Sequence, residues 1–171
     1  MENLIDLGSF KSIVDEMLRP HTAHHATVTA YLRTSLVKVP AVYVFKLGNV
    51  GDVRNVFDVP LCVPDNHAIL KYGRTVDLKR RMSEHLRLYG KLSPGVDMGL
   101  CYHVMMHPTR LVDAEDFIGK SFKERGWWLN NPRYVELGVV SQKELKDDVR
   151  CLFKELVGLY VDVDVDADAR L

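Results

Sequence analysis

Hydrophobic and polar residues follow two different periods along this chain, and the changes of period predict where helices and strands lie. Apolar residues recur at helical spacing over 2–18, and the apolar positions of 21–36 suit a short second helix. Runs of β-branched and aromatic residues at 41–47 and 67–72 predict two buried strands that pair as an antiparallel hairpin. The segment between them, 48–66, is rich in Gly, Pro, Asp and Asn and is predicted to be a long loop.

The second half of the chain predicts three helices with strands between them. The first helix is capped by Thr75 or Asp77 and closed by the glycines of 90–95, and a strand over 100–107 follows it. The second helix runs from about Asp113 through Lys123, and Gly126 stops it. A loop over 127–133, a short strand over 134–140 and a helix from about Gln142 to Tyr160 complete the order. Ser141 and Glu144 have the spacing of a capping box, which marks the start of that last helix.

This order of elements indicates an α+β fold, namely a small three-stranded antiparallel sheet flanked by helices. The length of 171 residues favours one main domain. We therefore divide the chain into an N-terminal helical extension (1–39), a main domain that includes the C-terminal helix (40–160), and an acidic tail (161–171). The tail alternates like a strand, but its density of Asp is equally typical of a disordered segment.

Composition narrows the class of protein. Lysine plus arginine and aspartate plus glutamate are equal at 23 each, so the net charge gives no argument for a nucleic-acid partner. The charges are unevenly distributed, however, because 71–91 is strongly basic, and a local basic face is compatible with docking on DNA or RNA. Three widely spaced cysteines argue against a disulfide framework and fit a reducing compartment. With neither a membrane-spanning apolar run nor a basic leader, we expect an intracellular protein, cytoplasmic or nuclear (nucleoid), that is not secreted.

The most informative stretch is a strand–turn–helix over 70–85. A strand ends at Gly73, a turn follows, and the next helix opens with three consecutive basic residues. This layout directs cationic side chains and helix N-terminal N–H groups at one place, where a phosphate could lie. An ordinary solvated helix face has the same charge pattern, so the stretch needs partners elsewhere in the sequence to indicate a site.

Those partners complete a set of side chains suited to phosphodiester cleavage. The predicted elements contribute a phenol, an ammonium group, two guanidiniums and a carboxylate: Tyr43, Lys71, Arg74, Arg81 and Glu115. Hydrolysis of a phosphodiester requires an activated nucleophile, stabilisation of the charge in the transition state and, usually, a hard metal ion. The set is sufficient for hydrolysis with one divalent metal ion.

In order and spacing, these residues resemble the motifs of the GIY-YIG nuclease superfamily. The matching segments are Val42-Tyr43-Val44, Lys71-Tyr72-Gly73, the helix arginine Arg81, and Ala114-Glu115 at the start of a later helix. The resemblance covers about 40–131, and the basic run after Lys71 looks most like the branch found in phages and large DNA viruses. The chain departs from the family pattern where Ala41 replaces a glycine and Lys71 replaces a tyrosine. Tyr72 occupies an aliphatic position of the second motif and is predicted to be structural, and the connection 48–66 is longer than the family norm.

The resemblance implies a one-metal hydrolysis of DNA. Glu115 would hold Mg²⁺ (or Mn²⁺) against the phosphate. Tyr43, with its pKa lowered by the nearby Lys71, would act as general base for water. Arg74 and Arg81 would bind the scissile phosphate.

Further DNA contacts are assigned to basic residues around the predicted helix and to one asparagine beyond the glutamate helix: Lys79, Arg80, Arg87, Lys91 and Asn131. His85 is assigned a structural rather than a catalytic role. The expected partners are DNA, with RNA left open, and a second copy of the chain, because a single site cuts one strand. The alternative is a catalytically silent DNA-binding module, which the replacements at Ala41 and Lys71 motivate. A third option is an unrelated α+β domain whose basic helix contacts another protein.

Overall fold

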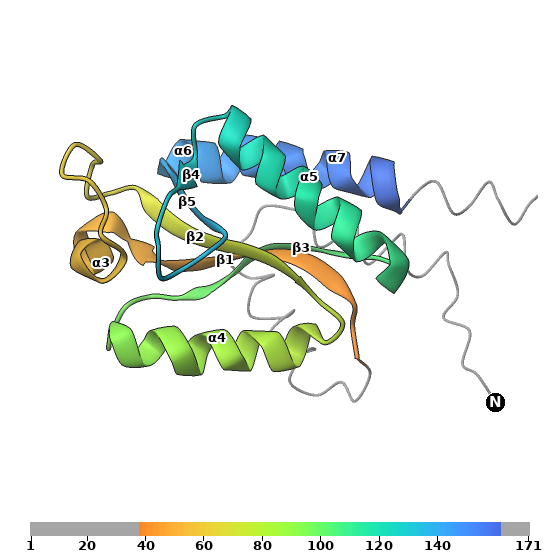
Figure 1. Ribbon diagram of the computed structural model, residues 1–171, viewed down its shortest axis with the longest axis horizontal. Helices are drawn as coiled ribbons and strands as arrows, with labels where there is room; N and C mark the ends of the chain where they lie inside the picture. Colours follow the sequence, from red (N-terminus) through yellow and green to blue (C-terminus); the bar gives the residue numbers. More distant parts are fainter. Residues whose placement is uncertain (1–37, 162–171) are drawn as a thin grey trace, which may run out of the picture.

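The computed structural model describes residues 38–161, and Figure 1 shows them as a five-stranded sheet between two layers of helices. The strands are β1 (Ala41–Asn49), β2 (Ala68–Thr75), β3 (Gly99–Met105), β4 (Trp128–Leu129) and β5 (Leu137–Val140). The helices are α3 (Val50–Phe57), α4 (Leu78–Leu92), α5 (Leu111–Glu124), α6 (Gln142–Glu144) and α7 (Arg150–Tyr160), with a 3₁₀ turn η1 (Pro108–Arg110) and a π-helical turn η2 (Leu145–Val149). The helices predicted over 2–18 and 21–36 and the tail over 162–171 lie outside the described residues.

The sheet is antiparallel in every pairing, in the order β3-β1-β2-β5-β4. The predicted α+β class is confirmed, and β1, β2 and β3 form the expected three-stranded unit. The prediction of only three strands is wrong, because β5 pairs with β2 and β4 pairs with β5. These two strands cover backbone groups that would otherwise be open along the edge of β2. β5 falls within the strand predicted over 134–140, whereas β4 falls within the predicted loop 127–133.

The segment predicted as a long loop, 48–66, contains the helix α3, so that prediction is wrong in part. Val50, Val53 and Phe57 recur at helical spacing and are buried against the sheet. Because the residues between them are polar, this short helical pattern is hard to recognise in the sequence. Arg54 then holds the rest of the segment in place, because its guanidinium donates to the Pro60 carbonyl at 2.5 Å, the Val63 carbonyl at 2.6 Å and the Asp65 carboxylate at 2.7 Å.

The helix α4 begins and ends where the sequence predicts. Asp77 is the N-cap, since its carboxylate accepts from the backbone N–H of Arg80 at 3.0 Å. Thr75 supports that cap by accepting from the N–H of Asp77 at 3.0 Å. The helix ends at Leu92, within the closing segment predicted over 90–95, and buries Leu78, His85 and Tyr89.

The C-terminal helical segment begins at the predicted capping box. The Ser141 hydroxyl accepts from the N–H of Glu144 at 3.1 Å, and the Glu144 carboxylate accepts from the N–H of Ser141 at 2.7 Å. The segment runs from Gln142 to Tyr160 as predicted, although the π-helical turn η2 separates α6 from α7. No helix among residues 38–161 has the length and apolar character needed to cross a membrane.

The two faces of the sheet form separate hydrophobic cores. Val44, Tyr72, Ile118, Phe122 and Phe153 belong to the core between the sheet and the helices α5 and α7. Figure 1 shows α5 and α7 above the sheet and α4 below it. The core on the α4 side contains the β1 and β2 residues whose side chains point to the opposite face of the sheet, together with Leu78 and Tyr89 of α4. Most of the candidate chemistry lies at the edge of this second core.

Candidate functional site

Tyr43 lies in the middle of β1 and faces α4. Its side chain is 3% exposed, and its hydroxyl lies 2.8 Å from Nε2 of His85 in α4. The two rings also pack against one another, with centroids 5.4 Å apart. In the tautomer that leaves Nε2 unprotonated, the phenol donates to the imidazole. His85 is therefore the proton partner of Tyr43, a position that sequence reasoning did not assign to it.

Gly73 lies directly across the sheet from Tyr43 and makes room for the phenol. A Cβ at Gly73 would come within 2.9 Å of the Tyr43 hydroxyl oxygen and 3.7 Å of Oε1 of Glu115. Any side chain at this position would therefore push the phenol aside. The glycine brings the phenol and the carboxylate to the same point of β2.

Glu115 is in the first turns of α5 and points back to the end of β2. Its carboxylate accepts from Nε of Arg74 at 2.6 Å and from the backbone N–H of Arg74 at 3.1 Å. The Glu115 side chain is 19% exposed, whereas the Arg74 side chain is 45% exposed, so the guanidinium is at the solvent side of the pair. A substrate anion could reach Arg74 more easily than Glu115.

Lys71 lies on β2 with its ammonium group directed at the loop before β5. Nζ donates to the Val135 carbonyl at 2.9 Å and to the Glu136 carboxylate at 2.5 Å. Glu136 has a left-handed backbone with φ of 58°, which a non-glycine residue adopts at a cost. Sequence reasoning missed Glu136, because neither its type nor its spacing marks a position that only the loop conformation brings to Lys71.

Arg81 completes the set from the first half of α4. Its Nη1 lies 3.1 Å from the Glu84 carboxylate, and its buried Nε makes no hydrogen bond to a described residue. Together, the five residues predicted to be catalytic line one cavity of about 410 Å³: Tyr43, Lys71, Arg74, Arg81 and Glu115. His85 and Glu136 line the same cavity. We call this cavity the active pocket, after the activity that we propose for it below.

Burial controls the titration of the phenol and the imidazole. It raises the pKa of Tyr43 above the usual range, and the positive charge of Arg81 offsets this only in part. The prediction that Lys71 lowers the pKa of Tyr43 is wrong, because the burial of the phenol dominates and the Lys71 ammonium is paired with Glu136. Burial, reinforced by the charges of Lys71 and Arg81, lowers the pKa of His85 to about 4, so the imidazole is neutral at physiological pH.

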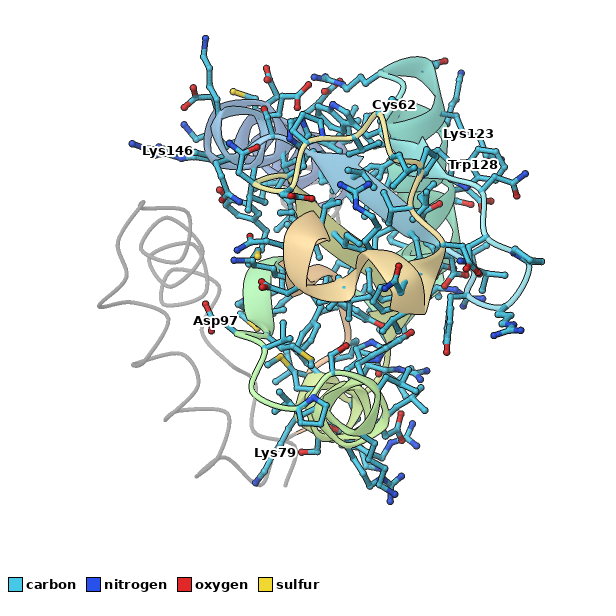
Figure 2. The ribbon with its side chains drawn as sticks, turned by 90° about the vertical axis from the view of Figure 1, so that its left-hand side faces the viewer. Cys62, Lys79, Asp97, Lys123, Trp128 and Lys146 are labelled. Carbon is cyan, nitrogen blue, oxygen red and sulfur yellow. The ribbon has the colours of Figure 1, made fainter. Side chains whose placement is uncertain are left out.

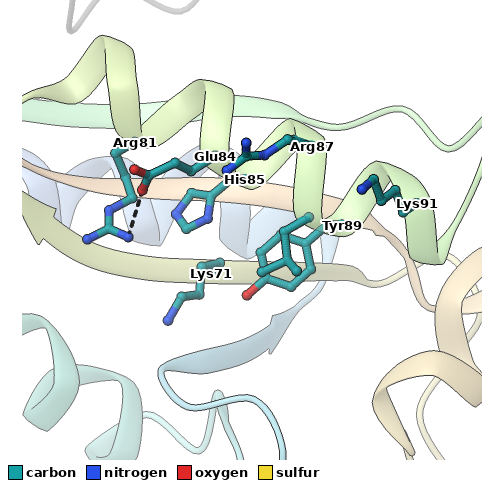
Figure 3. A pocket seen from close by; sticks show the side chains of 8 residues that line it. Lys71, Arg81, Glu84, His85, Arg87, Tyr89 and Lys91 are labelled. Atoms are coloured by element: carbon teal, nitrogen blue, oxygen red, sulfur yellow. Dashed lines mark ion pairs between the residues drawn. The ribbon is translucent and has the colours of Figure 1, made fainter.

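The residues predicted to contact DNA are distributed over several places. Lys79 points outward from α4 (Figure 2). Arg80 pairs with Glu84 one turn further along α4, at 2.9 Å. Arg87 and Lys91 are exposed and line a second cavity along the same helix (Figure 3).

Asn131 is not at the active pocket, because it is buried in the loop before β5. Its amide donates to the Phe57 carbonyl at 2.7 Å, and its side-chain carbonyl accepts from the N–H groups of Arg133 and Tyr134 at 2.8 and 3.0 Å. All the polar atoms of the side chain are thus engaged within the fold. The contacts of Asn131 fix the loop that carries Glu136.

The donor set at Glu115 fits a metal ion that arrives with its substrate better than a resident ion. Among residues 38–161, no group of three or more His, Cys, Asp or Glu side chains is arranged to hold a metal. Mg²⁺ is commonly bound by one or two carboxylates together with waters and substrate phosphates, and Glu115 can supply one such carboxylate. Each oxygen of this carboxylate already accepts one hydrogen bond from Arg74.

The comparisons with known proteins return viral relatives. The chain is 33% identical over 113 residues to uncharacterized protein L5 of Acanthamoeba polyphaga mimivirus, 31% identical over 106 residues to uncharacterized protein L12 and 34% identical over 100 residues to uncharacterized protein R865 of the same virus. These alignments cover 66%, 62% and 57% of this chain, but only 24%, 22% and 16% of the three relatives. The chain is thus similar to one part of longer viral proteins. No sequence model of a protein family and no solved structure matches it.

Proposed function

We propose that this protein is a metal-dependent DNA endonuclease with a GIY-YIG-type site. The observation that supports the proposal is the convergence of Tyr43, Lys71, Arg74, Arg81 and Glu115 on one pocket from three separate parts of the sequence. These residues lie on two strands and two helices, so the sequence spacing alone does not require them to meet. A phenol, three cations and a carboxylate around one cavity match what hydrolysis of a phosphodiester requires.

In this proposal Tyr43 and His85 transfer the proton of the attacking water. The Tyr43 hydroxyl oxygen takes a proton from water as its own proton passes to Nε2 of His85, 2.8 Å away. The oxygen of the water forms the new bond to phosphorus, and the bond from phosphorus to O3′ breaks, so that O3′ leaves with the electron pair of that bond and takes a proton from solvent water. The phenol need not ionise by itself, which resolves the conflict between its raised pKa and a role as base. A bound phosphodiester would also offset the charges of Lys71 and Arg81 that lower the pKa of His85.

The cations of the active pocket bind and orient the phosphate. Arg81 presents a buried Nε without a partner among the described residues, so this donor is available to a phosphate oxygen. Arg74 presents a half-exposed guanidinium that can exchange the Glu115 carboxylate for a phosphate. When Glu115 is released in this way, it would hold Mg²⁺ or Mn²⁺, which stabilises negative charge on the phosphate and on the leaving oxygen.

A catalytically silent DNA-binding module is the second candidate, and one observation favours it. Lys71, Arg74 and Arg81 each pair with a carboxylate of the protein itself, namely Glu136, Glu115 and Glu84. A site in which every cation has an internal partner can bind a phosphate without reaching a cleaving arrangement. The two candidates differ in whether Glu115 affects turnover or only the position of Arg74.

The test is nicking of supercoiled plasmid in Mg²⁺ or Mn²⁺, with an EDTA control. We expect nicking by the wild type and a loss of about 10²–10³-fold in Glu115→Gln, because the substitution removes the charged ligand but keeps the shape. Asp116→Asn is the matched control, since Asp116 is the exposed neighbour of Glu115 on the same helix. Binding of DNA without nicking by the wild type would favour the silent module. Nicking unchanged in Glu115→Gln would overturn the metal assignment.

A further inference from the structure

A second cavity adjoins the active pocket along α4 and has no role in the proposed reaction. It measures about 440 Å³, and we call it the helix groove. The helix groove shares Lys71, Arg81 and His85 with the active pocket and adds Arg87, Tyr89 and Lys91 from the second half of α4 (Figure 3). The two cavities are therefore adjacent, with these three side chains between them.

The helix groove carries an excess of unpaired positive charge. Arg87 and Lys91 are exposed, and neither side chain forms an ion pair or hydrogen bond with any residue of 38–161. Glu84 is the one carboxylate that lines the groove among the described residues, and it is already paired with Arg80 and Arg81 at 2.9 and 3.1 Å. The groove thus offers two free cations and no free anion among these residues.

Tyr89 adds a hydrogen-bond donor to the wall of the groove. Its side chain is only 5% exposed, and its ring packs between Phe57 and Tyr134, with centroids 6.0 and 6.1 Å away. Its hydroxyl is directed into the groove (Figure 3) and makes no hydrogen bond to a described residue. Tyr89 is not among the residues with a buried polar atom that lacks a partner, so its hydroxyl lies at the surface of the groove. Within residues 38–161 this donor has no acceptor, and it lies next to the cations of Arg87 and Lys91.

The geometry points to the helix groove as a subsite for a second phosphate of the same DNA strand whose scissile phosphate lies in the active pocket. This inference rests on the proposed function. Arg87 and Lys91 come six and ten residues after Arg81 in one helix. At a rise of about 1.5 Å per residue they lie about 9 and 15 Å further along the helix axis. Phosphates of one strand in duplex DNA repeat every 3.4 Å or so along the duplex axis, so an axial distance of about 9–15 Å corresponds to about three or four nucleotides from the cut.

A nucleic-acid strand fits these features better than an isolated anion. A single anion would occupy one cavity, whereas a chain of regularly spaced phosphates occupies both at once. Leu88 also lines the groove and is 54% exposed, so it offers an apolar surface to a sugar beside the cations. The Tyr89 hydroxyl would donate to a phosphate oxygen while Arg87 and Lys91 neutralise the charge.

The test measures binding of a fluorescent duplex of about 20 base pairs by the full chain in EDTA, over a series of salt concentrations. We expect Arg87→Gln/Lys91→Gln to bind about tenfold more weakly and to reduce the slope of log affinity against log salt by about two. The control is Lys146→Gln/Lys154→Gln, which removes the same charge from exposed residues of η2 and α7, across the sheet from α4 (Figure 1; Lys146 is labelled in Figure 2), and should bind within twofold of the wild type. Tyr89→Phe should bind about three- to tenfold more weakly with the salt slope unchanged, because it removes a hydrogen bond and no charge.

Arg81→Gln separates this inference from the proposed function. If Arg81→Gln loses affinity while Arg87→Gln/Lys91→Gln binds like the control, the helix groove is not a subsite and the proposed function stands. If the wild type itself does not bind the duplex, both the groove assignment and the proposed function are overturned. Equal loss in the groove variant and in the control variant would also overturn the groove assignment, because it would reflect net charge alone.

Discussion

The two faces of the sheet carry two tyrosines that are equally buried and differently partnered. Tyr43 is 3% exposed and Tyr72 is 4% exposed. Tyr72 packs its ring on Phe122, with centroids 4.8 Å apart, and lies in the core under α5 and α7. Tyr43 packs on His85 and places its hydroxyl 2.8 Å from Nε2 at the wall of the active pocket. Burial therefore does not distinguish a structural tyrosine from a candidate catalytic one, but the partner of the hydroxyl does.

The difference arises from the alternation of side chains along a strand. Lys71 and Gly73 point to the α4 face, and Tyr72 between them points to the α5 face. On the α4 face the apolar core ends in a group of polar residues around a cavity. On the α5 face the packing is apolar throughout the contact of Tyr72, Phe122 and Trp127. We therefore expect substitutions on the two faces to affect different properties, namely stability on one and activity on the other.

The largest effect on stability is expected at Phe122 on the α5 face. Phe122 is fully buried and lies so close to Gly138 of β5 that no Cβ fits between them. Phe122→Ala should lower the free energy of unfolding by about 3–5 kcal/mol, because it leaves a cavity in a close-packed core. Urea denaturation followed by circular dichroism measures this effect. A loss below about 1 kcal/mol would contradict the picture of this face as the structural one.

The identities of several elements could be predicted from the sequence because their signals are local. The strands β1 and β2 and the caps of α4 and of the last helical segment follow from residue type and spacing. The helix α3 was missed because three apolar residues in a polar segment are too few to show a period. The strand β4 was missed because two residues carry no periodicity at all, and only pairing with β5 makes them a strand.

The site residues could be named from the sequence, but their partners could not. A motif fixes residue types and order, so it leads to Tyr43, Arg81 and Glu115. The ion pair of Lys71 with Glu136 joins residues 65 positions apart through a loop with a left-handed residue, which no local pattern encodes. His85 follows Arg81 by one helical turn, and this spacing is the signal that could have placed it in the pocket.

The sharpest test of the comparison removes the same atom from each tyrosine. Tyr43→Phe should reduce nicking about 10²–10³-fold, because the proton relay to His85 is lost, while stability changes by only about 1 kcal/mol for one hydrogen bond. Tyr72→Phe should leave nicking within twofold and stability within about 0.5 kcal/mol, since no described residue accepts from its hydroxyl. Plasmid nicking and urea denaturation of both variants measure the two properties. Equal losses of activity in the two variants would end the distinction between the faces.

A dependence of stability on pH also belongs to the Tyr43 face. His85 and His103, which lies on β3 directly opposite Tyr43 of β1, both have their pKa lowered to about 4 by burial. In the unfolded chain a histidine titrates near 6.5, so between about pH 6.5 and 4 the unfolded state binds protons that the folded state does not. Stability is therefore constant above about pH 6.5 and falls as the pH drops toward 4, by up to about 1.4 kcal/mol per pH unit for each histidine.

Substitution of one histidine should remove the contribution of one proton to the slope of stability against pH. His85→Gln is expected to lose stability less steeply below pH 6.5 than the wild type, by up to about 1.4 kcal/mol per pH unit, in urea denaturation at intervals from pH 7.5 to 4.5. Phe122→Leu is the control from the opposite face, because it lowers stability by a similar amount at every pH and leaves the slope unchanged. A slope in His85→Gln equal to that of the wild type would mean that the imidazole takes up a proton in the folded state. The proposed proton transfer depends on a neutral His85 imidazole, and that assignment would then be wrong.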